Sequence, residues 1–292
     1  YLKRAVLYPN YFYRRFTIQK KNGGHRVLTE PLPSLKEIQT WILTEILYRI
    51  KVSRYAKAYV KNRGIKDHAR YHAGQPQVLT LDIQKFFDSL SFELGEKVFR
   101  EIGYSKIVAN LLAKLCFLDG ALPQGAPTSP YLSNILLREF DASIEEYCRN
   151  NSLKYTRYAD DLAFSGNIRK PDLPVNQETE LEKLVRAELG KLGLVLNNKK
   201  TRLMRQNVPQ IVSGIIVNQK LQVPKSERNA LRNTMYFIIK FGLADHLKRI
   251  DESRRNYLKH LMGRVSYVLL INPKDSEFLR YRQHLAELMK KS

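Results

Sequence analysis

The tetrapeptide Tyr158-Ala159-Asp160-Asp161 places two adjacent carboxylates between two strand-like segments. Residues 153–157 (LKYTR) have strand composition, and residues 162–164 (LAF) resume the apolar pattern before Ser165-Gly166 ends it. The pattern predicts a β-hairpin with the acids at its tip. Because side chains alternate across a strand, one Asp should point into a site and the other away or toward its rim. Such a pair can hold a hard divalent cation, although a lone Asp-Asp pair is more often a solvated turn.

A third acid, Asp82, follows an apolar run upstream. Residues 78–83 read VLTLDI and are followed by QKFFD at residues 84–88. A buried strand that ends on Asp82 would bring an ionised group to the edge of a sheet, where only a metal or another cation makes its desolvation tolerable. The alternative is that Asp82 caps the next turn and that Asp88 is solvated.

A proline-rich loop lies between these acids. Residues 122–130 read LPQGAPTSP, so three prolines stiffen the loop while Gly125 lets its backbone approach a ligand closely. Thr128 or Ser129 is then expected to begin a helix with Pro130 in its first turn.

Length and charge limit the possible functions. The chain has 292 residues, of which 43% are hydrophobic, and a formal net charge of +22. One catalytic unit with a smaller attached domain fits this length. The positive excess favours phosphate-rich partners, with an RNA-binding structural protein or an anionic-membrane binder as alternatives. No long apolar span or basic amphipathic anchor stands out, so no membrane partner is expected. Cys116 and Cys148 lack metal-ligand spacing and fit buried free thiols in a reducing cytoplasm.

Taken in order, these segments and three others resemble a reverse transcriptase, and in particular the bacterial retron reverse transcriptases. The matching segments are a fingers segment at 20–26 (KKNGGHR), four palm motifs at 81–87 (LDIQKFF), 123–130 (PQGAPTSP), 158–161 (YADD) and 193–201 (GLVLNNKKT), and a primer-grip region at 211–218 (IVSGIIVN). Each motif is modest alone, but their shared order makes coincidence very improbable.

The resemblance implies an α+β fold of the right-hand polymerase type, with fingers, a palm containing an antiparallel sheet, and a helical thumb. We expect fingers and N-terminal helices over residues 1–75, the palm with interleaved fingers elements over 76–223, and the thumb over 224–292. The helical patterns rich in Lys and Arg that begin near Pro224 fit the last of these.

The resemblance also implies roles for individual residues. Two Mg²⁺ ions would be held by Asp82, Asp160 and Asp161, and these acids would form the catalytic centre. Phe87 stands where this family places a ring beneath the sugar, which excludes a 2′-hydroxyl; its alternative role is a core aromatic. The residues expected to contact the nucleotide are Lys20, Arg26, Ile83, Phe87, Gln124 and Lys200, and those of the primer grip are Val212, Ser213 and Gly214. Lys200 could also donate a proton to pyrophosphate, although a solvated lysine is its alternative role.

The function implied is that of an RNA-directed DNA polymerase that copies a structured non-coding RNA into cDNA in phage defence. Its partners would be that RNA, the cDNA product, dNTPs and, as a further candidate, an effector protein. Three positions depart from the usual retron pattern: His68 replaces Asn, Asp88 replaces Pro, and Ser213 replaces Thr. Another bacterial defence reverse transcriptase, a non-catalytic RNA-binding scaffold on a polymerase fold, and an RNA-directed RNA polymerase are the alternatives.

Overall fold

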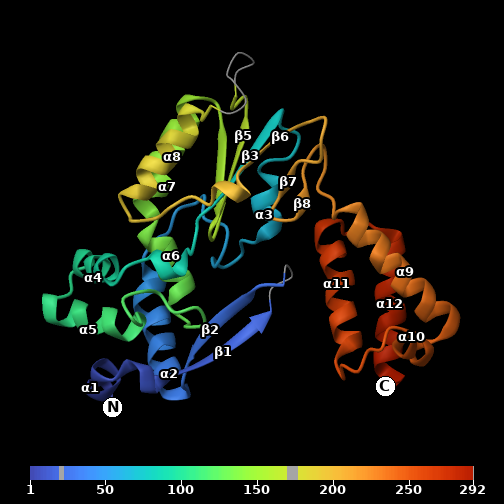
Figure 1. The fold of residues 1–292 in the computed structure, drawn as a ribbon, viewed down its shortest axis with the longest axis horizontal. Helices are drawn as coiled ribbons and strands as arrows, with labels where there is room; N and C mark the ends of the chain where they lie inside the picture. Colours follow the sequence, from blue (N-terminus) through green and yellow to red (C-terminus); the bar gives the residue numbers. More distant parts are fainter. Residues whose placement is uncertain (20–22, 170–176, 292) are drawn as a thin grey trace. The chain divides into compact units, whose positions relative to one another are not determined.

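The computed structural model describes residues 1–19, 23–169 and 177–291, and these form two compact units (Figure 1). The first unit contains Tyr1–His68 and Pro76–Leu203, and the second contains Ala69–Gln75 and Met204–Ser292. The short helix α3 (Ile65–Arg70) and the strand β6 (Arg202–Arg205) each include a boundary between the units.

A four-stranded sheet forms the centre of the first unit. Its strands are β3 (Gln77–Asp82), β4 (Lys154–Tyr158), β5 (Asp161–Gly166) and β6, in the order β4-β5-β3-β6. Strand β5 is antiparallel to both β3 and β4, so the predicted hairpin is confirmed. The side chains of Leu79, Leu81, Leu162 and Phe164 are buried in the core, which anchors the sheet by the hydrophobic effect.

The first unit also contains several α-helices and shorter helical turns. Helix α7 packs against β4 and against α8. Figure 1 shows α7 and α8 on the same side of the sheet. The α-helices are α1 (Leu2–Leu7), α2 (Pro33–Trp41), α4 (Phe92–Glu101), α5 (Lys106–Cys116), α6 (Ser129–Leu136), α7 (Arg138–Asn150) and α8 (Glu180–Gly190). The shorter turns are η1 (Pro9–Phe12), η2 (Ile42–Ile46), η3 (Leu47–Arg49), η4 (Phe87–Ser89) and η5 (Asn198–Lys200). Helix α6 begins at Ser129 with Pro130 in its first turn, as the sequence predicts.

A second hairpin in the first unit carries part of the predicted nucleotide site. Strands β1 (Tyr13–Gln19) and β2 (His25–Pro31) pair antiparallel as a sheet of their own. Arg26 faces Ile18 in this register. Lys20 lies outside the described residues.

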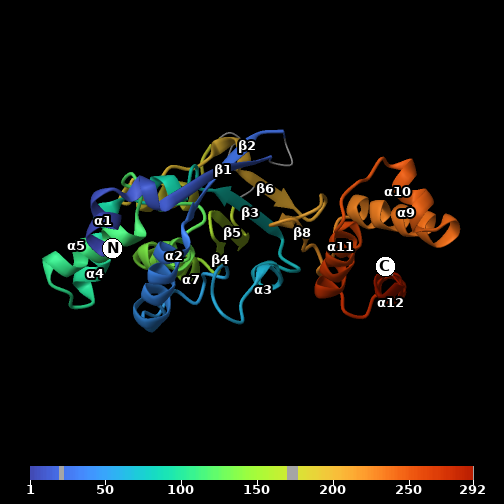
Figure 2. The same cartoon turned by 90° about the horizontal axis from the view of Figure 1, so that it is seen from below.

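The second unit is mostly helical. A short hairpin of β7 (Ile211–Val212) and β8 (Ile215–Ile216) precedes α9 (Lys225–Phe241), α10 (Leu243–Arg249), α11 (Tyr257–Ile271) and α12 (Ser276–Lys291), and Figure 2 shows these helices from a second direction. Buried apolar residues from α9, α11 and α12 form its core: Leu231, Met235, Ile238, Leu261, Val265, Val268, Phe278 and Leu285. The helical pattern predicted after Pro224 is therefore confirmed.

Two further findings concern cysteines and membranes. Cys116 and Cys148 are both buried and free, as predicted. Among the described residues, no helix has both the length and the apolar character needed to cross a membrane.

Candidate active site

Three aspartates meet at one end of the central sheet. Asp82 ends β3, Asp161 begins β5, and the two residues are direct partners in the antiparallel register. Asp160 lies in the tight turn between β4 and β5, where its carbonyl oxygen accepts a hydrogen bond from the Ile83 amide at 3.0 Å. Pairing between the strands thus brings together acids that are far apart in the sequence.

Asp82 is held by residues of the segment 193–201. Its side chain is only 8% exposed. Lys200 Nζ lies 2.7 Å from Asp82 Oδ2, and Asn197 Nδ2 donates to Asp82 Oδ1 at 3.3 Å. The backbone amide of Asn197 also donates to the carbonyl oxygen of Asp82 at 2.8 Å. The hydrogen bond to Asp82 raises the pKa of Lys200, which keeps its ammonium group charged.

Asp160 is in an environment that disfavours its negative charge. Burial, followed by the nearby charge of Asp161, raises the pKa of Asp160 from 3.8 to about 6, and Asp82 adds to the effect. A bound cation would relieve this repulsion, so the donor set suits a hard divalent metal. Within the described part of the chain, however, no group of three or more His, Cys, Asp and Glu side chains is already arranged around a metal position. The ammonium of Lys200 neutralises Asp82 in this arrangement.

A cleft of about 730 Å³ lies beside two of the three acids. Asp82 and Asp160 line it, whereas Asp161 is outside its lining, which matches the alternation expected along the strand. The predicted nucleotide contacts among the described residues also line this cleft: Arg26, Ile83, Phe87, Gln124 and Lys200. The structure therefore gathers these residues from five separate segments of the chain around one space in the first unit.

Phe87 and its neighbours form an aromatic wall of the cleft. The Phe87 ring lies 6.3 Å from the ring of Tyr59 and 5.2 Å from that of Phe86, measured between centroids. Phe86 is almost fully buried, while Phe87 is half-buried. Phe87 is thus the more accessible of the two rings.

The proline-rich loop packs closely against β2. The Thr29 amide donates to the Gln124 carbonyl oxygen at 2.7 Å, and a Cβ added at Gly125 would lie 2.8 Å from the Thr29 carbonyl oxygen. Gly125 also has φ +135°, so both its space and its backbone conformation require glycine. The Gln124 side chain donates to Asp88 Oδ1 at 3.4 Å, which gives Asp88 a partner in the loop.

The proposed primer-grip residues belong to the second unit. Val212 ends β7 and pairs with Ile215 of β8, while Ser213 and Gly214 form the turn between them. Ser213 has φ 43° and Gly214 has φ 84°, as a two-residue hairpin turn requires.

The departure at His68 has a structural explanation. His68 is fully buried, and its Nδ1 lies 2.7 Å from the Thr156 hydroxyl on β4. Burial lowers the pKa of His68 to about 3, so the ring is neutral. A neutral imidazole can therefore serve as a buried polar partner of the central sheet.

Sequence reasoning missed several residues of this region. Tyr59 lines the cleft, and Asn197 binds Asp82, yet neither was singled out. Asn197 lies within the segment 193–201, so its place beside Lys200 was a usable signal. Tyr59 had no comparable signal, because only the fold brings it next to Phe87.

The family described as "Reverse transcriptase (RNA-dependent DNA polymerase)" matches residues 18–233. The retron Ec83 reverse transcriptase of Escherichia coli is 30% identical, over 97% of this chain and 91% of its own length. The retron Ec86 enzyme of Escherichia coli is 29% identical, over 99% and 85%, and the retron Mx65 enzyme of Myxococcus xanthus is 32% identical, over 93% and 64%.

Two solved structures support the fold alone. A foamy viral protease-reverse transcriptase in complex with double-stranded DNA aligns with a TM-score of 0.51 at 13% identity, covering 96% of this chain and 39% of its own. Telomerase from Candida albicans in complex with a fragment of telomeric RNA aligns with a TM-score of 0.50 at 11% identity, covering 94% and 59%. Together with the mixed helices and antiparallel sheet, these matches confirm the predicted right-hand polymerase fold.

Proposed function

We infer the chemistry of the cleft from the family of this chain. The chain belongs to the reverse transcriptases and is an RNA-directed DNA polymerase of the retron type. We propose that Asp82, Asp160 and Asp161 bind two Mg²⁺ ions. The observation that carries this proposal is the meeting of the three acids at one sheet end, with the pKa of Asp160 raised by burial and by its neighbours. When bound, the two ions would activate a 3′-hydroxyl and stabilise the leaving pyrophosphate.

Lys200 has two roles in this proposal. The ammonium of Lys200 neutralises Asp82, so binding of a metal by Asp82 would require Lys200 to leave that carboxylate. Once released, Lys200 faces the cleft as a charged donor and can transfer a proton from Nζ to an oxygen of pyrophosphate. The raised pKa of Lys200 keeps the proton available until release.

The rest of the cleft would position the nucleotide. We propose that Arg26, together with Lys20, contacts the triphosphate, that the Ile83 backbone contributes a carbonyl oxygen, and that Gln124 contacts the nucleotide or the template. Phe87 would select deoxynucleotides by a steric clash with a 2′-hydroxyl, and its accessible ring supports this role. Val212, Ser213 and Gly214 would hold the primer through their tight turn.

The test of this function is primer extension on an RNA template with dNTPs or rNTPs. We expect extension by dNTPs that requires Mg²⁺ and that is abolished by Asp160→Asn, while the variant still binds RNA. A scaffold protein would show no extension, and an RNA-directed RNA polymerase would prefer rNTPs. Extension by Asp160→Asn at the wild-type rate would refute the metal assignment.

We further propose that the template is one structured non-coding RNA encoded beside the gene, and that the reaction yields a cDNA linked to it in phage defence. The curated relatives named above are retron enzymes, and the charge of +22 supports general affinity for RNA. The two buried free thiols fit the cytoplasm as the site of reaction.

The test is to express the gene with its flanking DNA and to sequence the co-purified nucleic acid. Extension of generic primed RNA without any discrete RNA or linked cDNA would favour another defence reverse transcriptase. An effector protein would be sought by mass spectrometry of the same sample.

A further inference from the structure

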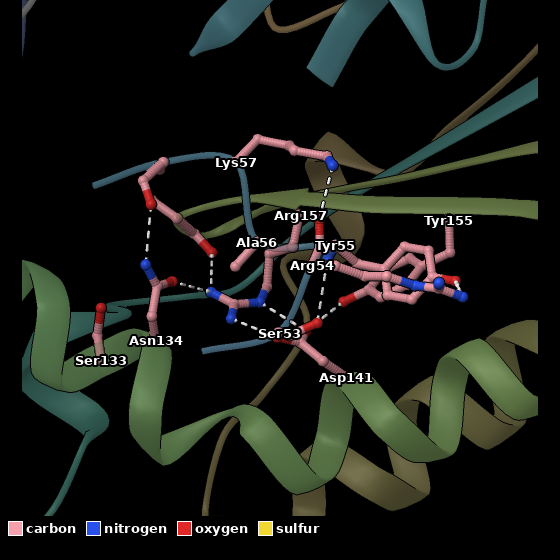
Figure 3. A network of polar contacts seen from close by, with 12 residues as sticks. Ser53, Arg54, Tyr55, Ala56, Lys57, Ser133, Asn134, Asp141, Tyr155 and Arg157 are labelled. Atoms are coloured by element: carbon pink, nitrogen blue, oxygen red, sulfur yellow. Dashed lines mark hydrogen bonds and ion pairs between the residues drawn. The ribbon is translucent and has the colours of Figure 1, made fainter. Parts of the chain in front are cut away.

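A fully buried ion pair involves Arg157, close to the end of β4 that leads into the turn with Asp160, hereafter the catalytic turn; Figure 3 shows the pair and its neighbours. Arg157 on β4 and Asp141 on α7 both have 0% exposure. Arg157 Nε donates to Asp141 Oδ1 at 2.8 Å and Nη2 donates to Oδ2 at 2.7 Å, while the Tyr155 hydroxyl donates to Oδ1 at 2.7 Å. Two-pronged pairing of this kind is strong and fixes the plane of the guanidinium. A buried pair is nevertheless a poor means of gaining stability, because an apolar pair of similar volume often does as well.

The third nitrogen of Arg157 binds the catalytic turn itself. Nη1 donates to the Ala159 carbonyl oxygen at 3.3 Å and to Asn134 Oδ1 on α6 at 3.0 Å. Ala159 immediately precedes Asp160 and has φ 58°. A non-glycine residue in this left-handed conformation costs free energy and persists only where its surroundings hold it. The contact with Arg157 is one such restraint.

Asn134 extends the network to a second residue of the cleft. Its Nδ2 donates to the Ala58 carbonyl oxygen at 2.8 Å. Ala58 immediately precedes Tyr59, which lines the cleft, contacts Phe87 and has φ 61°. The network therefore ends on the carbonyl groups of Ala159 and Ala58. These residues immediately precede Asp160 and Tyr59, which both line the cleft. Two left-handed residues, Ala159 and Tyr59, are thus connected to the one guanidinium, Ala159 directly and Tyr59 through Asn134 and Ala58.

The backbone of Arg157 joins the same two regions. Its amide donates to the Tyr55 carbonyl oxygen at 2.9 Å, and its carbonyl oxygen accepts from the Lys57 amide at 2.8 Å. The segment 53–57 thus runs beside β4, as Figure 3 shows. Displacement of Arg157 would disturb the segment that leads to Tyr59 as well as the turn that leads to Asp160.

We propose that Arg157 is a positioning residue that fixes Asp160 and Tyr59 relative to each other, so that the metal-binding acid and the aromatic wall of the cleft keep one geometry. Asp141 and Tyr155 orient the guanidinium, and Asn134 transmits its position to Tyr59. This inference rests on the proposed function of Asp160 as a metal ligand.

The test uses a variant that removes the network without leaving a buried charge. In Arg157→Met/Asp141→Leu the pair becomes apolar, so the protein should fold. A matched control is Ile144→Ala, because Ile144 is a fully buried apolar residue of the hydrophobic core on the same helix as Asp141. Arg157→Lys is a second variant, because it keeps a charge opposite Asp141 but lacks the fork that also reaches Ala159 and Asn134.

Three measurements distinguish a positioning role of Arg157 from a general effect on stability. Two use protein from which metal has been removed, and the third measures polymerase activity. Mn²⁺ titration by electron paramagnetic resonance should give a dissociation constant about tenfold or more higher in both Arg157 variants, since loss of groups that orient metal ligands typically costs about 10–100-fold in affinity. Hydrogen exchange of the turn between β4 and β5 should be faster in both. Asn134→Ala should leave Mn²⁺ binding unchanged but raise the KM for dNTP, because it removes the link to Tyr59 while Arg157 keeps its hydrogen bonds to Asp141 and Ala159.

The outcomes are distinct. If both Arg157 variants fold, bind Mn²⁺ with the wild-type constant and show wild-type exchange in the turn, the inference is wrong and the pair is merely structural. The same holds if Ile144→Ala shows the same losses. If Asp160→Asn binds Mn²⁺ as tightly as the wild type, the proposed metal site fails instead. Hydrogen exchange would then still decide whether Arg157 holds the turn.

Discussion

Replacement of Asp160 by Asn should stabilise the metal-free protein at neutral and higher pH. Folding raises the pKa of Asp160 from 3.8 to about 6, chiefly through burial and secondly through the charge of Asp161. Because the folded-state pKa is raised, the contribution of the neutral carboxyl to stability is fully present below pH 3.8 and is lost as the pH rises through about 6. The difference between these two pKa values corresponds to about 3 kcal/mol of lost stability at pH 8. Asn is neutral at every pH and avoids this loss.

Urea unfolding in the presence of EDTA would measure the effect. Trp41 is the only tryptophan and lies in the first unit, so its fluorescence reports on the unit that contains Asp160. The gain of Asp160→Asn over the wild type should be largest at pH 8, at up to about 3 kcal/mol, and should shrink toward pH 4.5. Added Mg²⁺ should narrow the gap, because it binds the wild-type acid more tightly than the amide. Asp251→Asn, at an exposed position of the second unit, is the control.

The reasoning would be refuted by a variant that is no more stable than the wild type at pH 8, or by a difference that does not change with pH. Either result would mean that the environment of Asp160 does not disfavour its charge. The argument that the cleft is built for a cation would then lose its main support.

The cleft and the proline-rich loop beside it allow three further tests. Phe87→Ala should raise the use of rNTPs relative to dNTPs by at least about tenfold, or roughly 1.4 kcal/mol, in single-nucleotide extension, and a smaller change would count against the steric gate. Lys200→Arg keeps a cation beside Asp82 but cannot donate a proton, so single-turnover extension should slow by about 10²-fold or more; a near-wild-type rate would leave Lys200 only its electrostatic role. Gly125→Ala should destabilise the protein by about 1–3 kcal/mol in thermal unfolding, because its Cβ would meet the Thr29 carbonyl, and unchanged stability would contradict the close packing of the loop.

Local patterns in the sequence were enough to identify several elements. The hairpin around Asp160 and Asp161, the strand that ends on Asp82, and the helix that begins at Ser129 each depend on residues adjacent in the chain. Such elements follow from alternation, turn chemistry and capping, which act over a few residues. The order of the motifs then identified the family, and with it the right-hand fold.

Contacts between distant residues were decided only by the tertiary structure. Lys200 reaches Asp82 across 118 positions, and Asn134 reaches the Ala58 carbonyl across 76. Arg157 reads in the sequence as an ordinary basic residue of a strand, yet it is fully buried with Asp141. No local pattern specifies these contacts, because burial and charge pairing depend on which segments the fold brings together. The sequence alone thus determined the acids and the elements that carry them, whereas their electrostatic environment and the network behind them arise only from packing.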